Sequence, residues 1–174
     1  MMPVLSHAEL EAAALALEAE VGAELGSLIE PPVPFELTLD VLRLSLEVAD
    51  LSSGQASPVL GAISFSRRTV FIDRKTVVGV RFGFTVCHEI GHWRLHQPAF
   101  GIACDDTLCR DEDDAPRERE AERFAAYYLM PAWLVRSTTE GRDARDPGVL
   151  ARLAIKFGAS RQAMSIRLSQ LGLL

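Results

Sequence analysis

Hydrophobic residues recur with helical spacing at the start of the chain, from about residue 6 to residue 26. Ser6 followed by Glu9 forms a capping-box pattern, so we expect the helix to begin there. The prolines of residues 30–34 (EPPVP) interrupt it. Residues 35–51 change character: the first half predicts a short helix, whereas LRLSLEV alternates between apolar and polar residues as a strand does.

Two short β-rich runs follow, at residues 59–65 and 69–73, with the polar SRR between them. This pattern indicates a hairpin and hence a small antiparallel sheet. From about residue 75 to His96 the spacing becomes helical, and Pro98 should end the helix. Residues 97–116 read as an acidic loop.

The remaining pattern is helical. Residues 117–130 predict a second strong helix that ends at Pro131. After Gly141 we expect two short helices, 147–157 and 160–171, with a turn at Gly158. The pattern therefore predicts an α+β fold with a main domain over residues 1–136 and a small helical module over residues 137–174.

Composition narrows the class of protein. No run approaches 18 apolar residues, and the glutamates near the N-terminus do not suit a signal peptide. Three cysteines make no disulfide framework, and Cys104 and Cys109 have no further cysteine or histidine after them to complete a metal site. We therefore expect a cytoplasmic protein that does not enter a membrane.

The formal charge of −6 argues against broad nucleic-acid binding. The charge is uneven, because residues 105–114 hold six acidic side chains and one arginine, whereas residues 142–174 hold six basic and two acidic ones. The C-terminal segment alone could thus face an acidic partner, or it could simply have a solvated helix face.

The segment CHEIGHWRLH carries the candidate chemistry. On a helix, His88 and His92 lie about 40° apart and one turn along, so both imidazoles can reach one ion. Glu89 is rotated by about 100° from His88, where a general base for a metal-activated water is expected. Gly91 weakens the helix, and a second backbone packed close beside the site would be a reason to keep it.

His96 adds a third histidine, but eight residues of helix place it about 12 Å from His88. At that distance His96 is expected to lie at the end of the helix or behind the ligands, and not to be a ligand itself. A carboxylate from the next helix is the better third ligand. Glu118 and Glu122 are one turn apart, so one could ligate the ion while the other holds a ligand histidine, and Glu120 is expected to be a solvated charge.

An oxyanion donor is also needed for hydrolysis, and three residues are candidates for it. His96, Tyr127 and Tyr128 could each serve, and the sequence does not choose among them.

Taken together, RFGFTVCHEIGH with the following LH, and EREAERFAAYYLMP after it, resemble the ImmA/IrrE family of metallopeptidases. PPVP and GAISFSRRTVFID resemble the lead-in of that family, and FGASRQAMSIRLSQLGLL resembles its usual C-terminal end. The resemblance spans residues 30–174. It implies a zincin-like, more narrowly gluzincin-like, fold in its compact form, without the C-terminal sensor domain of some members.

The resemblance also implies roles for single residues. His88, His92 and Glu118 would be the metal ligands and Glu89 the general base. Glu122 stands where the family has Asn or Asp, so its role behind the ligands is a departure. Cys87 stands where alanine is common, which could place a thiol near the metal.

The expected cofactor is zinc, although manganese or another divalent ion also suits two histidines and a carboxylate. The resemblance implies an endopeptidase that cleaves a helix-turn-helix repressor and so releases the genes it controls. One alternative is a regulator that binds a repressor without cutting it. The other is a DNA-binding protein that uses Arg161 and Arg167 of the C-terminal helices, although packing of these helices on the main domain is the favoured expectation.

Overall fold

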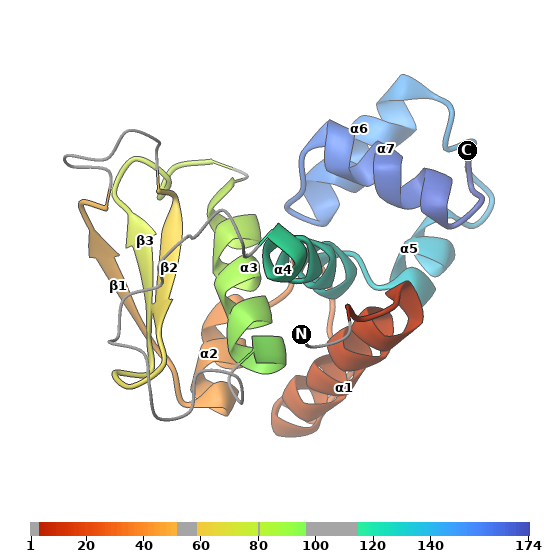
Figure 1. Ribbon diagram of the computed structural model, residues 1–174. Helices are drawn as coiled ribbons and strands as arrows, with labels where there is room; N and C mark the ends of the chain where they lie inside the picture. The colour runs from red at the N-terminus through yellow and green to blue at the C-terminus, as the bar shows by residue number, and fades with distance from the viewer. Residues whose placement is uncertain (1–3, 52–58, 80, 97–114) are drawn as a thin grey trace.

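The computed structural model describes residues 4–51, 59–79, 81–96 and 115–174. Figure 1 shows a small sheet at one end, then α3 and α4 side by side, and α1 and the C-terminal helices beyond α4. The elements of these ranges are α1 (His7–Leu25), α2 (Phe35–Leu42), β1 (Ser45–Ala49), β2 (Gly61–Ser64), β3 (Thr69–Asp73), α3 (Arg81–His96), α4 (Ala115–Leu129), α5 (Ala132–Thr139), α6 (Pro147–Lys156) and α7 (Arg161–Gln170). The predicted α+β class is confirmed.

The first helix begins as its sequence predicts. The Ser6 hydroxyl accepts a hydrogen bond from the Glu9 backbone N–H at 3.3 Å, and the Glu9 carboxylate accepts one from the Ser6 N–H at 2.8 Å. Gly26 ends the helix in the left-handed conformation, with φ of 70°. One face of α1 is buried at helical spacing, through Leu10, Ala14, Leu17 and Val21.

The sheet is mixed, with the strand order β1-β3-β2. The predicted hairpin is confirmed, because β2 and β3 pair antiparallel. The prediction of an antiparallel sheet is wrong for β1, which pairs parallel with β3. A parallel neighbour requires a long crossover connection, and the segment from β1 through β2 to β3 is long enough to provide one.

The start of α3 differs from the prediction by several residues. Residues that precede α3 form a turn in which the Thr76 N–H donates to the Asp73 carbonyl at 2.8 Å, and Gly79 has φ of 102°. The helix therefore begins at Arg81, six residues later than the pattern suggested. The helix α5 was not predicted, and the expected domain boundary after residue 136 falls inside it. The stop at Pro98 and the acidic loop up to residue 114 lie outside the described residues.

The helix α3 packs between the sheet and α4. On the sheet side, the rings of Phe65 and Trp93 stack with centroids 5.6 Å apart, and the Arg68 guanidinium lies 4.8 Å from the Trp93 ring. On the other side, a Cβ added to Gly91 would lie 3.1 Å from both the Cα and the carbonyl oxygen of Ala121. The close backbone approach expected at Gly91 is confirmed.

The C-terminal helices α6 and α7 match the predicted pair, with a turn at Gly158, whose φ is 63°. Arg161 is exposed. Arg167 is only 3% exposed: it donates to the Met130 carbonyl at 2.9 Å and to the Glu11 carboxylate at 2.6 Å. Arg167 therefore ties α7 to α4 and α1 and is not presented to a nucleic acid.

Within the described ranges, no helix combines the length and apolar character needed to cross a bilayer.

Candidate metal centre

Three side chains from two helices converge beside the close contact of α3 and α4. The Nε2 atoms of His88 and His92 are 3.1 Å apart. Each lies 3.3 Å from a different oxygen of the Glu118 carboxylate, Oε2 for His88 and Oε1 for His92, and α4 supplies Glu118. The three residues form a group that could hold a metal ion, and they are the three that the sequence nominated as ligands.

The spacing of the three donors suits a small divalent ion. Zinc–nitrogen and zinc–oxygen bonds of about 2.0–2.2 Å at tetrahedral angles place neighbouring ligand atoms about 3.3–3.5 Å apart. The Nε2 atoms of His88 and His92 are 3.1 Å apart, close to this spacing. Counting one donor atom from each residue, the donors of His88, His92 and Glu118 all lie within 4.8 Å of one another. Two imidazole nitrogens and the Glu118 carboxylate could therefore hold one divalent ion after small adjustments.

The electrostatics of the group favour metal binding. Hydrogen bonds from His88 and His92 hold the pKa of the Glu118 carboxyl well below its usual range, so the carboxylate is ionised near neutral pH. The side chains of His88 and Glu118 are 14% and 35% exposed, whereas that of His92 is 3% exposed. The group is thus closed on the His92 side and reachable from solvent on the other.

Glu89 is buried next to the edge strand of the sheet, with 2% of its surface exposed. A Cβ added to Gly61 in β2 would lie 2.7 Å from Glu89 Oε1 and 2.6 Å from the Thr85 side chain. The absence of a side chain at Gly61 therefore leaves room for the Glu89 carboxylate. Gly61 is the first residue of GAISFSRRTVFID, but no sequence feature pointed to this role.

A hydrogen-bonded chain runs from His92 away from the triad. The second nitrogen of His92, Nδ1, lies 3.0 Å from His96 Nδ1, and His96 Nε2 lies 3.0 Å from a Glu120 oxygen. The other Glu120 oxygen accepts the Leu5 backbone N–H at 2.6 Å. Burial lowers the pKa of His96, although the bond to Glu120 opposes this shift.

This chain changes the expected use of the glutamates on α4. The expectation that Glu120 is solvated is wrong, because Glu120 is 6% exposed and bonded to His96. Glu122, nominated to hold a ligand histidine, is exposed. The carboxylate behind the ligands is therefore Glu120, two residues earlier.

The two tyrosines nominated as oxyanion donors have other partners. The Tyr127 hydroxyl bonds to His7 Nδ1, and the Tyr127 ring lies under the Arg167 guanidinium at 4.5 Å. The Tyr128 hydroxyl lies 2.6 Å from the Thr38 hydroxyl, and burial raises the pKa of Tyr128. These contacts commit both hydroxyl groups to holding α4 against α1 and α2.

Cys87 precedes the first histidine but is fully buried. Burial raises the pKa of its thiol to about 12, so the reactive thiolate is scarcely populated near neutral pH. Cys87 therefore acts as a core residue, and its burial does not favour a reactive thiol near the metal.

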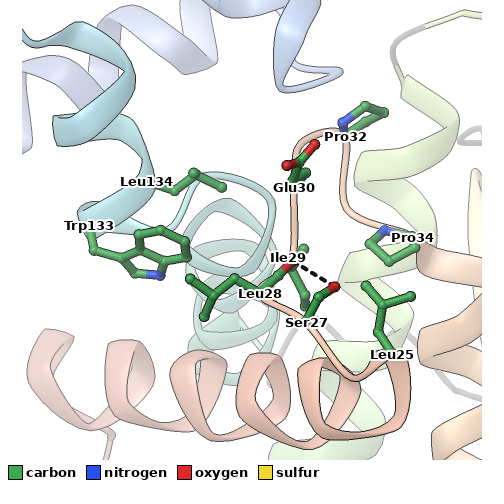
Figure 2. A pocket seen from close by; sticks show the side chains of 9 residues that line it. All are labelled: Leu25, Ser27, Leu28, Ile29, Glu30, Pro32, Pro34, Trp133 and Leu134. Atoms are coloured by element: carbon green, nitrogen blue, oxygen red, sulfur yellow. Dashed lines mark hydrogen bonds between the residues drawn. The ribbon is translucent and has the colours of Figure 1, made fainter.

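A surface groove of about 620 Å³ lies elsewhere, between the end of α1, the segment leading to α2 and the start of α5. Figure 2 shows Leu28 and Trp133 facing each other across it. Its lining is mostly apolar and includes one titratable side chain, that of Glu30. The groove has no constellation for catalysis, so the triad remains the candidate site.

Two histidines and a carboxylate on paired helices, beside a small sheet, place the chain in the class of α+β proteins with a candidate metal centre. The model of the IrrE N-terminal-like domain, peptidase M78, matches residues 36–169. The chain therefore belongs to this family.

A transcriptional regulator from Mycobacterium tuberculosis has a similar structure, with a TM-score of 0.59 and 17% sequence identity. The match covers 91% of this chain and 47% of the regulator, so this chain spans about half the length of that protein. At this identity the likeness shows a shared fold. A search of curated proteins gave no match.

Proposed function

We propose that the protein is a cytoplasmic zinc-dependent endopeptidase that cleaves a helix-turn-helix transcriptional repressor. The observation that carries the proposal is the triad of His88, His92 and Glu118, whose donor atoms lie within 4.8 Å of one another, together with the buried Glu89 that follows His88 in the chain. Membership of the peptidase M78 family supports the same chemistry.

In this proposal each residue has a defined task. A divalent ion held by His88, His92 and Glu118 would supply Lewis-acid activation of water and of the scissile carbonyl. Glu89 accepts the proton of the attacking water and then passes it to the leaving amine. The exposed sides of His88 and Glu118 leave space for a peptide to approach.

The proposed substrate follows from the family and from the shared fold. The chain belongs to the IrrE N-terminal-like family, and the similar mycobacterial protein is described as a transcriptional regulator. A repressor is therefore the substrate class to test first. Direct DNA binding through α7 is not supported, because one of its two basic candidates, Arg167, is buried.

The test uses the purified full chain loaded with zinc and the helix-turn-helix repressor encoded beside it. Wild type should cut the repressor into two fragments. Glu89→Gln should bind zinc as wild type does but leave the repressor whole, because the variant lacks the base. Glu122→Gln, which alters an exposed glutamate in the same way, should cut normally.

Two outcomes would reject the proposal. Cleavage by Glu89→Gln at the wild-type rate would remove Glu89 from the mechanism. A repressor that stays intact with wild type, yet forms a complex with it, would instead favour a regulator that sequesters its partner.

A further inference from the structure

Behind the candidate ligand His92 lies a chain of three buried side chains. His92, His96 and Glu120 are 3%, 5% and 6% exposed, and their successive polar atoms are 3.0 Å apart. Both oxygens of Glu120 are used, one by His96 and the other by the Leu5 N–H. Such burial of a carboxylate and two imidazoles is costly unless each polar atom is paired, and here they pair with one another.

The direction of the hydrogen bonds follows from the geometry of His92. Its Nε2 atom points to His88 and Glu118, so a metal bound there would take the lone pair of that nitrogen. A neutral imidazole that ligates through Nε2 carries its proton on Nδ1. His92 Nδ1–H then donates to His96 Nδ1, and the remaining proton of His96, on Nε2, is donated to Glu120.

We propose that Glu120, acting through His96, is a positioning residue for the metal ligand His92: it fixes the tautomer and the ring orientation of that ligand. The proposal rests on the proposed metal centre. In many metal sites a carboxylate accepts the free N–H of a ligand histidine directly. In this protein His96 lies between the ligand His92 and the carboxylate of Glu120. The carboxylate on α4 therefore restrains the His92 ring on α3 through His96.

The proposal gives His96 and Glu120 a joint role that neither could have alone. Without Glu120, no bond to His96 Nε2 remains among the described residues to select the His96 tautomer that accepts from His92. Without His96, the Glu120 carboxylate has no described bond to the ligand. Their effects on metal binding must therefore depend on each other, whereas two independent structural contributions would add.

The experiment measures metal binding by the full-length protein freed of metal, with Zn²⁺ titrated against a chelator of known affinity. Glu120→Gln should weaken zinc binding by about 10- to 100-fold. The matched control is Glu122→Gln, the same change on an exposed side chain of the same helix, and it should stay within about twofold of wild type. His96→Phe should lose as much affinity as Glu120→Gln, and adding Glu120→Gln to His96→Phe should cost less than twofold more.

A second readout separates positioning from a general loss of structure. In the Co²⁺-loaded protein, the visible absorption bands report the ligand geometry, so Glu120→Gln should alter them and Glu122→Gln should not. If the glutamine variant folds poorly, the same comparison is made with His96→Phe, whose ring fills the same space. Wild-type affinity and an unchanged cobalt spectrum for Glu120→Gln and His96→Phe would overturn the inference, as would additive losses in the double variant.

Failure of the metal centre itself would look different. In that case wild type would bind neither Zn²⁺ nor Co²⁺ tightly, or Glu118→Gln and His92→Ala would bind as wild type does. Tight binding that depends on His92 and Glu118 but is insensitive to Glu120 and His96 would keep the centre and reject the positioning chain.

Discussion

The contact between α3 and α4 at Gly91 sets the distance across the candidate centre, and Gly91→Ala tests this directly. The new Cβ would lie 3.1 Å from the Cα and carbonyl oxygen of Ala121 and 3.2 Å from the Phe124 ring. Because two of these atoms are backbone, α4 itself must move by a few tenths of an ångström. Alanine favours the helix by about 1 kcal/mol, whereas overpacking costs about 1–3 kcal/mol. We expect a net loss of about 0–2 kcal/mol.

Zinc affinity should fall as well, since α4 carries Glu118 and ligand positions are set within about 0.2 Å. The matched control is Gly83→Ala on the same helix, where an added Cβ meets nothing within 4 Å. It should gain about 0.5–1 kcal/mol and bind zinc normally. Urea unfolding of the metal-free proteins and a chelator competition measure both quantities. If Gly91→Ala and Gly83→Ala are stabilised equally and bind zinc equally well, the contact between Gly91 and Ala121 does not set the position of Glu118.

Three further changes have defined outcomes. Gly61→Ala should slow repressor cleavage at unchanged zinc affinity, because its Cβ displaces the Glu89 carboxylate; equal cleavage rates would contradict this. Arg167→Met should lower the free energy of unfolding by about 2–3 kcal/mol, since it strands the carbonyl and carboxylate that the guanidinium bonds. The control is Arg161→Met, at an exposed arginine of the same helix, which should change the free energy of unfolding by less than about 0.5 kcal/mol. Equal losses for the two variants in urea titrations would show that Arg167 does not hold α7 to α4 and α1. The pKa of Glu118 is lowered from 4.5, so its stabilisation of the metal-free protein is complete above pH 4.5 and lost as the pH falls below it. The stability gap between wild type and Glu118→Gln should therefore shrink in acid, and a gap independent of pH would contradict the ion pairing.

Local signals predicted most of the fold. The capping box at Ser6, the prolines around residue 32 and the turn at Gly158 are short-range features, and the structure has each where the sequence placed it. The parallel pairing of β1 with β3 joins residues 24 positions apart, and no local pattern encodes which edge of a hairpin a third strand will join. The late start of α3 has a similar origin, because the turn at Thr76 and Gly79 interrupts an otherwise helical spacing.

The site shows the same division between local and tertiary information. Spacing on one helix nominated His88 and His92, and the family resemblance nominated Glu118, but the roles of Glu120 and Glu122 depended on which face of α4 is buried. Its apolar residues Ala121, Phe124, Ala125 and Tyr128 place the centre of that face about 70° from Glu118, 90° from Glu120 and 110° from Glu122. A difference of about 20° cannot decide whether Glu120 or Glu122 is the buried carboxylate. Packing decides it, because the segment before α1 covers Glu120 through Leu5 and leaves Glu122 exposed.

The donor atoms of the triad already lie within 4.8 Å of one another, and the reasons lie in contacts that do not involve a metal. The Gly91–Ala121 approach fixes how far Glu118 stands from the histidines, and the hydrogen bond between His92 and His96 holds the ring of His92. Small metal domains such as zinc fingers instead need the ion in order to fold. Here the core extends through α1, α3, α4 and the C-terminal helices without passing through the triad. Metal binding can therefore draw on a preformed site, so its free energy is available for affinity and for activating the substrate rather than for folding the chain.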